Sequence, residues 1–364
     1  MPDTATPLSP PRRGVIAPIQ YLRGFAAMLV VWHHAQEQFP TLKALFNTQF
    51  GNSGVDLFFV ISGFIMVVTT AGHEGGAGRF IRKRILRVVP LYWLLTLLVV
   101  AMAVVAPSLF HATHPTLAHV LKSLLFIPHE SPSHPGMAWP VLVPGWSLNY
   151  EMFFYAIFAA SLFVRPVWRL ALLAGVLSGL VAIGLLFGPF DNLPLRAYTS
   201  LLLAEFVVGA VIAHAWLAGK TVARPAVAAL GLVVGLALLL ARGTSLSTLA
   251  QIVGAGLVVS CALSESFAAW RSALLQRLGD ASYSLYLTHL FALGGMRWAW
   301  GKFAPAPHGW ADGFLFMVLG VCFSGWIGWL AYRHLEVPVT NILNGWFDRH
   351  ASRRRLAATA RGPA

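Results

Sequence analysis

Long apolar runs separated by short polar segments dominate the chain. Ten runs approach the roughly 20 apolar residues that a helix needs to cross a bilayer core of about 30 Å. They cover residues 19–37, 53–71, 88–106, 147–164, 169–188, 196–217, 225–241, 246–263, 281–300 and 312–333. We therefore expect an all-α, polytopic integral membrane protein of about ten transmembrane helices. The first, fourth and ninth runs stand out because they contain ionisable side chains.

The composition supports the membrane class. Hydrophobic residues make up 57% of the 364 residues and charged residues only 11%, against about a quarter in soluble domains. The net charge of +13 would suit a nucleic-acid-binding protein, but the cations cluster in short segments between the apolar runs, as topology signals do. We therefore expect membrane lipids around the chain and no nucleic acid. Cys261 and Cys322 both lie inside apolar runs, where we expect them to pack as small hydrophobic residues.

The positions of the basic residues predict an orientation. If the N-terminus is cytoplasmic, 19 of the 26 Lys and Arg residues lie on the cytoplasmic side, six lie on the other side, and Arg23 lies within a span. Short cytoplasmic loops are rich in Lys and Arg, so we expect both termini inside and an even number of helices. We expect a disordered N-terminal arm over residues 1–18, a transmembrane domain over 19–340 and a basic cytoplasmic tail over 341–364.

The first helix carries Arg23 and His34 on one face. At 100° per residue, eleven residues bring the two side chains to within about 20° of each other, roughly 16 Å apart along the axis. A charge in lipid costs several kcal/mol unless it is paired or lines a wet cavity. We expect both groups to line such a cavity, with a structural ion pair as the alternative. His33 points about 100° away, which favours a structural role.

Two carboxylates lie where they can meet His34. Asp56 follows the start of the second helix and Glu151 lies in the first turns of the fourth, and both helices begin on the predicted outer side. A carboxylate that binds one imidazole nitrogen fixes the tautomer and raises the basicity of the other nitrogen. The pattern does not distinguish which carboxylate would orient the histidine.

A basic cluster precedes the third helix. It consists of Arg82, Lys83, Arg84 and Arg87. Arg84 and Arg87 are three residues apart and share a helical face, which suits an anion with several phosphates; simple membrane anchoring is the alternative. In the ninth helix, Tyr286 and His289 are also three apart, and His289 is expected near mid-membrane as either a core or a functional residue.

The longest predicted loop, 107–146, is rich in histidine. Its members are His111, His114, His119, His129 and His134. Their spacing is irregular and no cysteine joins them, so we expect no metal site and favour a partly ordered lid over an outward-facing site. Trp139, Trp146 and Tyr150, near the outer face, can stack on a sugar ring or anchor the chain at the interface.

These segments resemble the membrane-bound acyltransferase family 3, whose members O-acylate surface and exported polysaccharides. The matching pieces are Arg23 with His34, "GVDLFFVISGF", Arg84 with Arg87 before Pro90, "WSLNYE" ending in Glu151, and "SYSLYLTHL". They come in the family order between residues 21 and 290, and "IQYLRGFAA" and "SLNYEMFFY" look most like the exopolysaccharide-acetylating branch. The resemblance implies an acyl-CoA donor, acetyl-CoA by default, and an acceptor sugar outside the bacterial cytoplasmic (inner) membrane.

The resulting hypothesis is an acyl-CoA-dependent O-acetyltransferase. Its expected catalytic residues are His34, Glu151, Arg23 and Asp56; its expected donor-binding residues are Arg84, Arg87, Arg82, Tyr286 and His289; and Trp146 and Tyr150 are expected to bind the sugar. His34 would act either as a general base or as an acylated intermediate. The expected partners are a polysaccharide or lipid-linked sugar acceptor and a polysaccharide biosynthesis or export complex. Alternatives are a proton-coupled transporter or a flippase of a lipid-linked sugar, or a structural subunit of an export complex.

Overall fold

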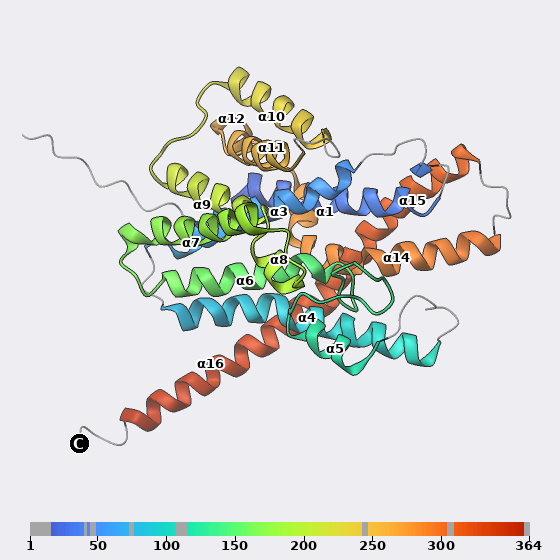
Figure 1. Ribbon diagram of the computed structural model, residues 1–364, viewed down its shortest axis with the longest axis horizontal. Helices are drawn as coiled ribbons and strands as arrows, with labels where there is room; N and C mark the ends of the chain where they lie inside the picture. The colour runs from blue at the N-terminus through green and yellow to red at the C-terminus, as the bar shows by residue number, and fades with distance from the viewer. Residues whose placement is uncertain are drawn as a thin grey trace, which may run out of the picture.

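The computed structural model describes residues 16–39, 42–43, 49–72, 76–106, 115–241, 247–303 and 309–359, and in these ranges the chain is helical with no strand (Figure 1). Most of the predicted N-terminal arm, as well as His111 and His114, lies outside them. The elements are α1 Ala17–Gln36, η1 Phe50–Asn52, α3 Ser53–Thr70, α4 Ala77–Val105, α5 Leu117–Leu124, α6 Gly145–Ser161, α7 Pro166–Phe187, α8 Leu193–Tyr198, α9 Leu203–Leu217, α10 Pro225–Leu240, α11 Ser247–Ala262, α12 Glu265–Ala268, α13 Ala273–Asp280, α14 Ser282–Phe303, α15 Trp310–Ala331, η2 Tyr332–Glu336 and α16 Val337–Thr359.

The helical content expected from the apolar runs is confirmed. Each of the ten runs coincides with a helix, except that the sixth is divided between α8 and α9. Among the described residues, five helical segments are long and apolar enough to cross a membrane: Phe50–Thr70, Ala77–Val105, Pro166–Phe187, Leu193–Leu217 and Trp310–Arg349. The count of ten spans and the orientation of the termini stay predictions.

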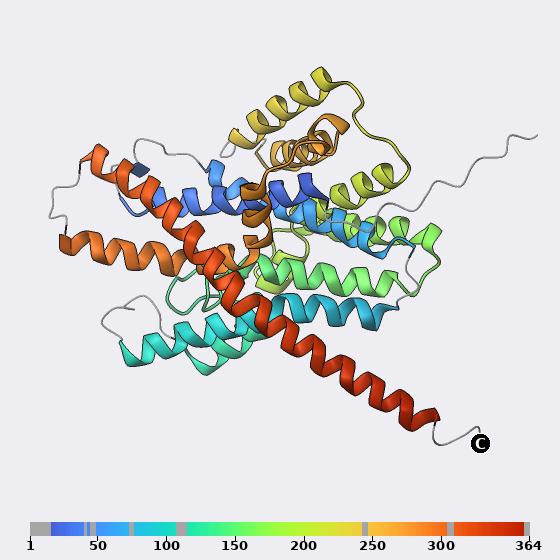
Figure 2. The same cartoon turned by 180° about the vertical axis from the view of Figure 1, so that it is seen from behind.

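Most of the long helices run alongside one another, horizontally in Figure 1, while α10 and α11 lie along one edge. Helix α16 crosses the others obliquely, as the view from behind shows (Figure 2). We call the end at which α4 begins, on the left of Figure 1, the basic side, because Arg82, Lys83 and Arg84 lie there. The opposite end, with α5 and the segment that leads to α6, is the loop side.

Close helix crossings depend on glycine. A Cβ atom on Gly209 would overlap the carbonyl oxygen of Val60, and one on Gly63 would overlap that of Phe206, so α3 and α9 can touch only because both positions lack a side chain. Small residues allow this approach between membrane helices. Gly54 has the same function between α3 and α1, where a Cβ would overlap the Ala26 carbonyl. This second crossing places the start of α3 against the helix that carries Arg23 and His34.

Two helix boundaries differ from the expected spans in ways that matter for the site. Helix α4 begins at Ala77, eleven residues before the expected span, so Pro90 lies inside it and Arg84 and Arg87 lie on a continuous helix. The π-helical turn η2 joins α15 to α16, and α16 continues past the expected domain boundary at residue 340. Single π-turns often occur at functional sites.

Candidate functional site

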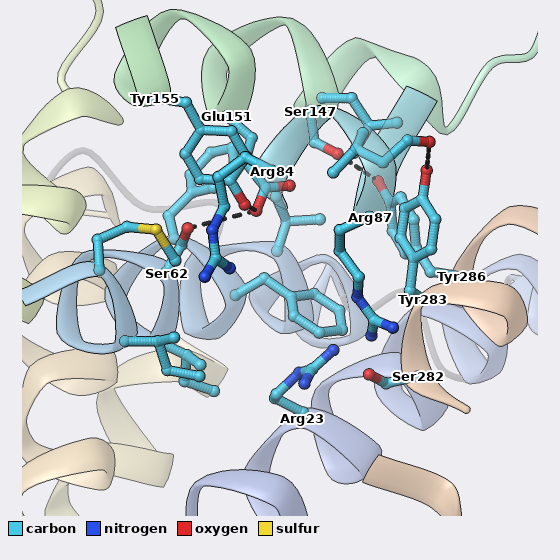
Figure 3. A pocket seen from close by; sticks show the side chains of 18 residues that line it. Arg23, Ser62, Arg84, Arg87, Ser147, Glu151, Tyr155, Ser282, Tyr283 and Tyr286 are labelled. Atoms are coloured by element: carbon cyan, nitrogen blue, oxygen red, sulfur yellow. Dashed lines mark hydrogen bonds between the residues drawn. The ribbon is translucent and has the colours of Figure 1, made fainter. Parts of the chain in front are cut away.

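A cavity of about 130 Å³ lies between α1, α3, α4, α6 and α14, toward the basic side. We call it the arginine cavity because Arg23, Arg84 and Arg87 line it together with one carboxylate, Glu151. Figure 3 shows the three guanidinium groups directed into the same space from α1 and α4. An excess of guanidinium over carboxylate groups in a partly buried space favours an anionic ligand.

Glu151 is held by hydroxyl groups on the wall of this cavity. Its Oε1 atom accepts hydrogen bonds from the Ser62 hydroxyl, at 3.3 Å, and from the Tyr155 hydroxyl (Figure 3). The expected meeting of Glu151 with His34 is therefore wrong. Glu151 lies six residues into α6, roughly 9 Å from its loop-side end, and so reaches the arginine cavity.

The three arginines of the cavity differ in their partners. Arg87 forms an ion pair with Glu336, whose other oxygen accepts a 2.6 Å hydrogen bond from Ser284. Arg23 donates to Gln20, whose amide in turn donates to Asp280. Arg84 lies against the Phe80 ring, and its buried Nε atom has no hydrogen-bond partner among the described residues. Arg84 is thus the cation best prepared to bind an added anion.

A second cavity of about 440 Å³ lies on the loop side of the first. We call it the histidine cavity, because His33, His34 and His289 line it. Asp56, which is buried, and Trp146 also line it, whereas Tyr150 does not. Of the two carboxylates expected near His34, only Asp56 shares its cavity.

The hydrogen bonds of two histidines define their tautomers. The His34 Nδ1 atom lies 2.9 Å from the carbonyl oxygen of Val30, and the His289 Nδ1 atom lies 2.7 Å from that of Tyr286. Because a carbonyl oxygen can only accept, each Nδ1 carries a proton and each neutral ring keeps its lone pair on Nε2. The backbone, and not a carboxylate, therefore orients His34.

The two imidazole rings are neighbours. Their centroids are 5.0 Å apart and their planes are inclined by 67°. His289 is fully buried, and its Nε2 atom has no hydrogen-bond partner among the described residues. His33 instead contacts Gln36 at the end of α1 and Glu37 just after it, with its ring nitrogens 3.2 and 3.7 Å from them. The His34–His289 pair can accept a proton from a bound hydroxyl group.

Tyr286 separates the two cavities. It lines both of them, as does Val55. Its hydroxyl group contacts the Ser147 hydroxyl and the Pro144 carbonyl, and the Phe58 ring packs edge-on against it at 5.8 Å. Arg23 and His34, on one face of α1, therefore border two adjacent cavities that share Tyr286 and Val55 as lining residues, where we had expected one continuous space.

The remaining expected site residues lie nearby. Trp146 lies between the histidine cavity and a small third cavity, which Tyr150 also lines. Arg82 contacts Asp348 of α16 at 3.4 Å and lines none of these cavities. Their roles, like those of the other expected site residues, stay predictions.

Sequence reasoning missed several site residues. Glu336 lies beyond the last expected span, and only the acid within "YRHLEVP" could have drawn attention to it. Tyr155 and Tyr283, which line the arginine cavity, looked like ordinary aromatic residues of apolar runs. In the histidine-rich segment, the structure pairs His119 with His129. No group of three or more potential metal ligands occurs among the described residues.

Comparisons with known proteins give consistent results. A family model described as an acyltransferase domain matches residues 16–333. The exopolysaccharide production protein ExoZ of Rhizobium meliloti (strain 1021) is 40% identical over 321 residues, which cover 86% of this chain and 95% of that protein. The acyltransferase MdmB of Streptomyces mycarofaciens is 27% identical over 404 aligned residues, covering 98% of this chain and 97% of that protein. No solved structure shows significant similarity to the chain.

Proposed function

Because the chain belongs to the membrane acyltransferase family whose model covers residues 16–333, we propose that it transfers an acyl group, acetyl by default, from acyl-CoA to a sugar hydroxyl across a bacterial cytoplasmic membrane. The family resemblance noted from the sequence motifs is confirmed by that model and by the 40% identical relative. The single observation that carries the mechanism is the pair of cavities along α1, one lined by three arginines and the next by two imidazoles with Nε2 lone pairs.

The donor enters from the basic side, which is cytoplasmic in this proposal. Arg84 and Arg87 bind CoA phosphate oxygens, since guanidinium groups recognise phosphate through paired hydrogen bonds. The arginine cavity, at about 130 Å³, holds only part of such a donor, so the remainder lies outside on the basic side. The thin pantetheine arm extends along the Arg23–His34 face, over roughly 16 Å, and presents its thioester to the histidine cavity.

The acceptor enters from the loop side. The His34 Nε2 atom removes the proton of a sugar hydroxyl, which is a poor nucleophile while it is protonated. The oxygen then attacks the thioester carbonyl carbon, the new C–O bond forms as the C–S bond breaks, and the CoA thiolate leaves with the proton from His34. His289 supports His34 from the side through the contact between the two rings. The printed name of the Rhizobium relative concerns exopolysaccharide production, which supports an exported polysaccharide as the acceptor.

The test of this proposal is to measure release of CoA from acetyl-CoA by the purified protein. The measurement is made without an acceptor and then with extracellular polysaccharide from a strain that lacks the gene. We expect polysaccharide-dependent release and label transfer to the polymer. His34→Ala should lower the rate by about 10²- to 10⁴-fold, the contribution of one positioned acid–base group. His214→Ala is the matched control, because His214 lines neither cavity. Unchanged turnover in His34→Ala would refute the mechanism, and absence of any turnover in the unmodified protein would favour a transporter or a structural subunit.

A further inference from the structure

The third cavity, which we call the aromatic cavity, has a composition of its own. It measures about 120 Å³ and is lined by Trp139, Trp146 and Tyr150, by Asn149 and by a few small residues. The Trp146 and Tyr150 rings stand edge to face, with centroids 6.0 Å apart. None of the residues that line it is charged. Aromatic walls with one polar group are typical of a site for an uncharged ligand that has apolar faces and hydrogen-bonding edges.

Asn149 provides the independent sign of a missing ligand. The residue is 3% exposed, and its Oδ1 atom is buried without a hydrogen-bond partner among the described residues. A buried amide oxygen without a hydrogen-bond partner destabilises the protein, because it has lost its hydrogen bonds to water without replacement. A lipid chain in this cavity would offer Asn149 no hydrogen-bonding group, whereas a ligand with hydroxyl groups offers donors beside this amide.

The aromatic cavity adjoins the histidine cavity. Trp139 and Trp146 line both of them, so the two cavities share a wall formed by two indole rings. A ligand that fills both cavities would pass along these rings. A linear chain of sugar units has the required chemistry, because each ring has an apolar face that stacks on an indole and hydroxyl groups around its edge.

We propose that the aromatic cavity is a second acceptor subsite, which binds the sugar unit next to the one that is acylated in the histidine cavity. The inference rests on the proposed function and adds that the acceptor is recognised over at least two glycosidically linked units. A nucleotide sugar does not fit, since its phosphates would need cations and the aromatic cavity has none among its lining residues. Trp139 and Asn149 are then residues that determine acceptor specificity.

The test compares acceptors of different length on the same preparation. The probe is extracellular polysaccharide from a strain that lacks the gene, used as oligosaccharides from partial hydrolysis and as monosaccharides from complete hydrolysis, with labelled acetyl-CoA as donor. For the unmodified protein we expect kcat/KM to be at least about tenfold higher for the oligosaccharides, which corresponds to about 1.4 kcal/mol. Because both rates come from one preparation, their ratio does not depend on how much of the protein is folded.

Two variants and one control complete the test. Asn149→Leu and Trp139→Leu should each bring the ratio close to one, by removing the hydrogen-bond acceptor or one stacking face. Met137→Ala, an exposed position in the same segment, should keep the ratio of the unmodified protein. The inference is overturned if the unmodified protein acylates oligosaccharides and monosaccharides with similar kcat/KM. It is also overturned if neither variant changes the ratio of the two values.

The failure of this inference can be told apart from failure of the proposed function. If saccharides are acylated in a His34-dependent reaction but the oligosaccharides have no advantage over the monosaccharides, the proposed function stands and the second acceptor subsite is wrong. If CoA release does not depend on His34, the proposed function itself is wrong, and the subsite loses its basis with it.

Discussion

The hydroxyl group of Tyr286 lies 2.8 Å from the hydroxyl oxygen of Ser147, at the partition between the arginine and histidine cavities. A second contact, 3.0 Å from the Tyr286 hydroxyl to the Pro144 carbonyl, closes the same position. The donor proposed here would have to pass this partition to bring its thioester to His34. If the proposed donor route is correct, the contact between α14 and α6 controls access from one cavity to the other.

Tyr286→Phe should loosen the partition. The substitution keeps the ring and removes hydrogen bonds that contribute about 0.5–1.5 kcal/mol each. We expect acceptor-independent hydrolysis of acetyl-CoA to rise about 2- to 10-fold, because water then reaches the thioester more often. The measurement is release of CoA by protein in lipid nanodiscs, with Tyr198→Phe as the control, since Tyr198 lines none of the three cavities. Hydrolysis that stays at the unmodified level would argue against a gating role for this contact.

Arg84→Ala should weaken donor binding with little effect on folding. The Arg84 Nε atom has no partner among the described residues, so its removal leaves no carboxylate unpaired. A hydrogen bond to a charged group contributes about 1.5–3 kcal/mol, and we expect the KM for acetyl-CoA to rise about 10- to 100-fold. Lys83→Ala is the matched control, because Lys83 is the exposed next residue and does not line the cavity. A rise of the same size in the control would indicate a general effect of surface charge.

The features that depend on a single helix were predictable from the sequence. The ten helical runs follow from apolar length, and the common face of Arg23 and His34 follows from the helical repeat. The structure places these two side chains on the walls of neighbouring cavities. The pairing of Arg84 with Arg87 was predictable for the same reason, although α4 begins eleven residues earlier than its apolar run.

The features that depend on contacts between helices were not predictable. Glu151 and Asp56 both lie near loop-side helix ends. Which cavity each side chain reaches depends on how far along its helix the residue lies and on how that helix is rotated against its neighbours. The partition at Tyr286 involves residues of α3, α6 and α14. Glu336 is buried because α16 and η2 pack against α4, and no periodicity in the sequence indicates such a contact.

Arg87→Leu should destabilise the protein. Adding Glu336→Leu to the same chain should restore the stability of the folded state. Glu336 is 2% exposed, forms an ion pair with Arg87 and accepts a hydrogen bond from Ser284. Leaving one member of a buried pair alone costs about 3–5 kcal/mol, whereas replacing both by apolar residues is often nearly neutral. We expect a lower thermal midpoint in the single variant and recovery in the double variant, measured by fluorescence in detergent.

Glu336→Leu alone should be the milder single change. The Arg87 side chain is 32% exposed and lines the arginine cavity, so it keeps access to water when its partner is removed. Equal losses in both single variants, or no recovery in the double variant, would show that the pair does not contribute to folding in this way.

A pair of histidines holds the segment on the loop side. The His129 Nδ1 atom lies 2.7 Å from the Ile127 carbonyl oxygen and therefore carries a proton, so its Nε2 atom accepts the 2.7 Å hydrogen bond from the His119 Nδ1 atom. Burial and the neighbouring imidazole of His129 lower the pKa of His119 to about 4 from an ordinary 6.5. Burial also lowers the pKa of His129. Both rings are neutral in the folded segment at pH 7.

Acidification should therefore loosen this segment before the rest of the protein. A histidine with a lowered pKa takes up its proton in the unfolded state first, so the stability that it provides is complete above about pH 6.5 and is lost as the pH falls toward 4. We expect hydrogen exchange in residues 117–124, corrected for its intrinsic pH dependence, to rise over this range in the unmodified protein. In His119→Gln, whose side chain stays uncharged, hydrogen exchange in this segment should depend less on pH. Peptides from α3 should show no change in corrected exchange with pH in either protein. The same pH dependence in both proteins would assign the effect to a different group.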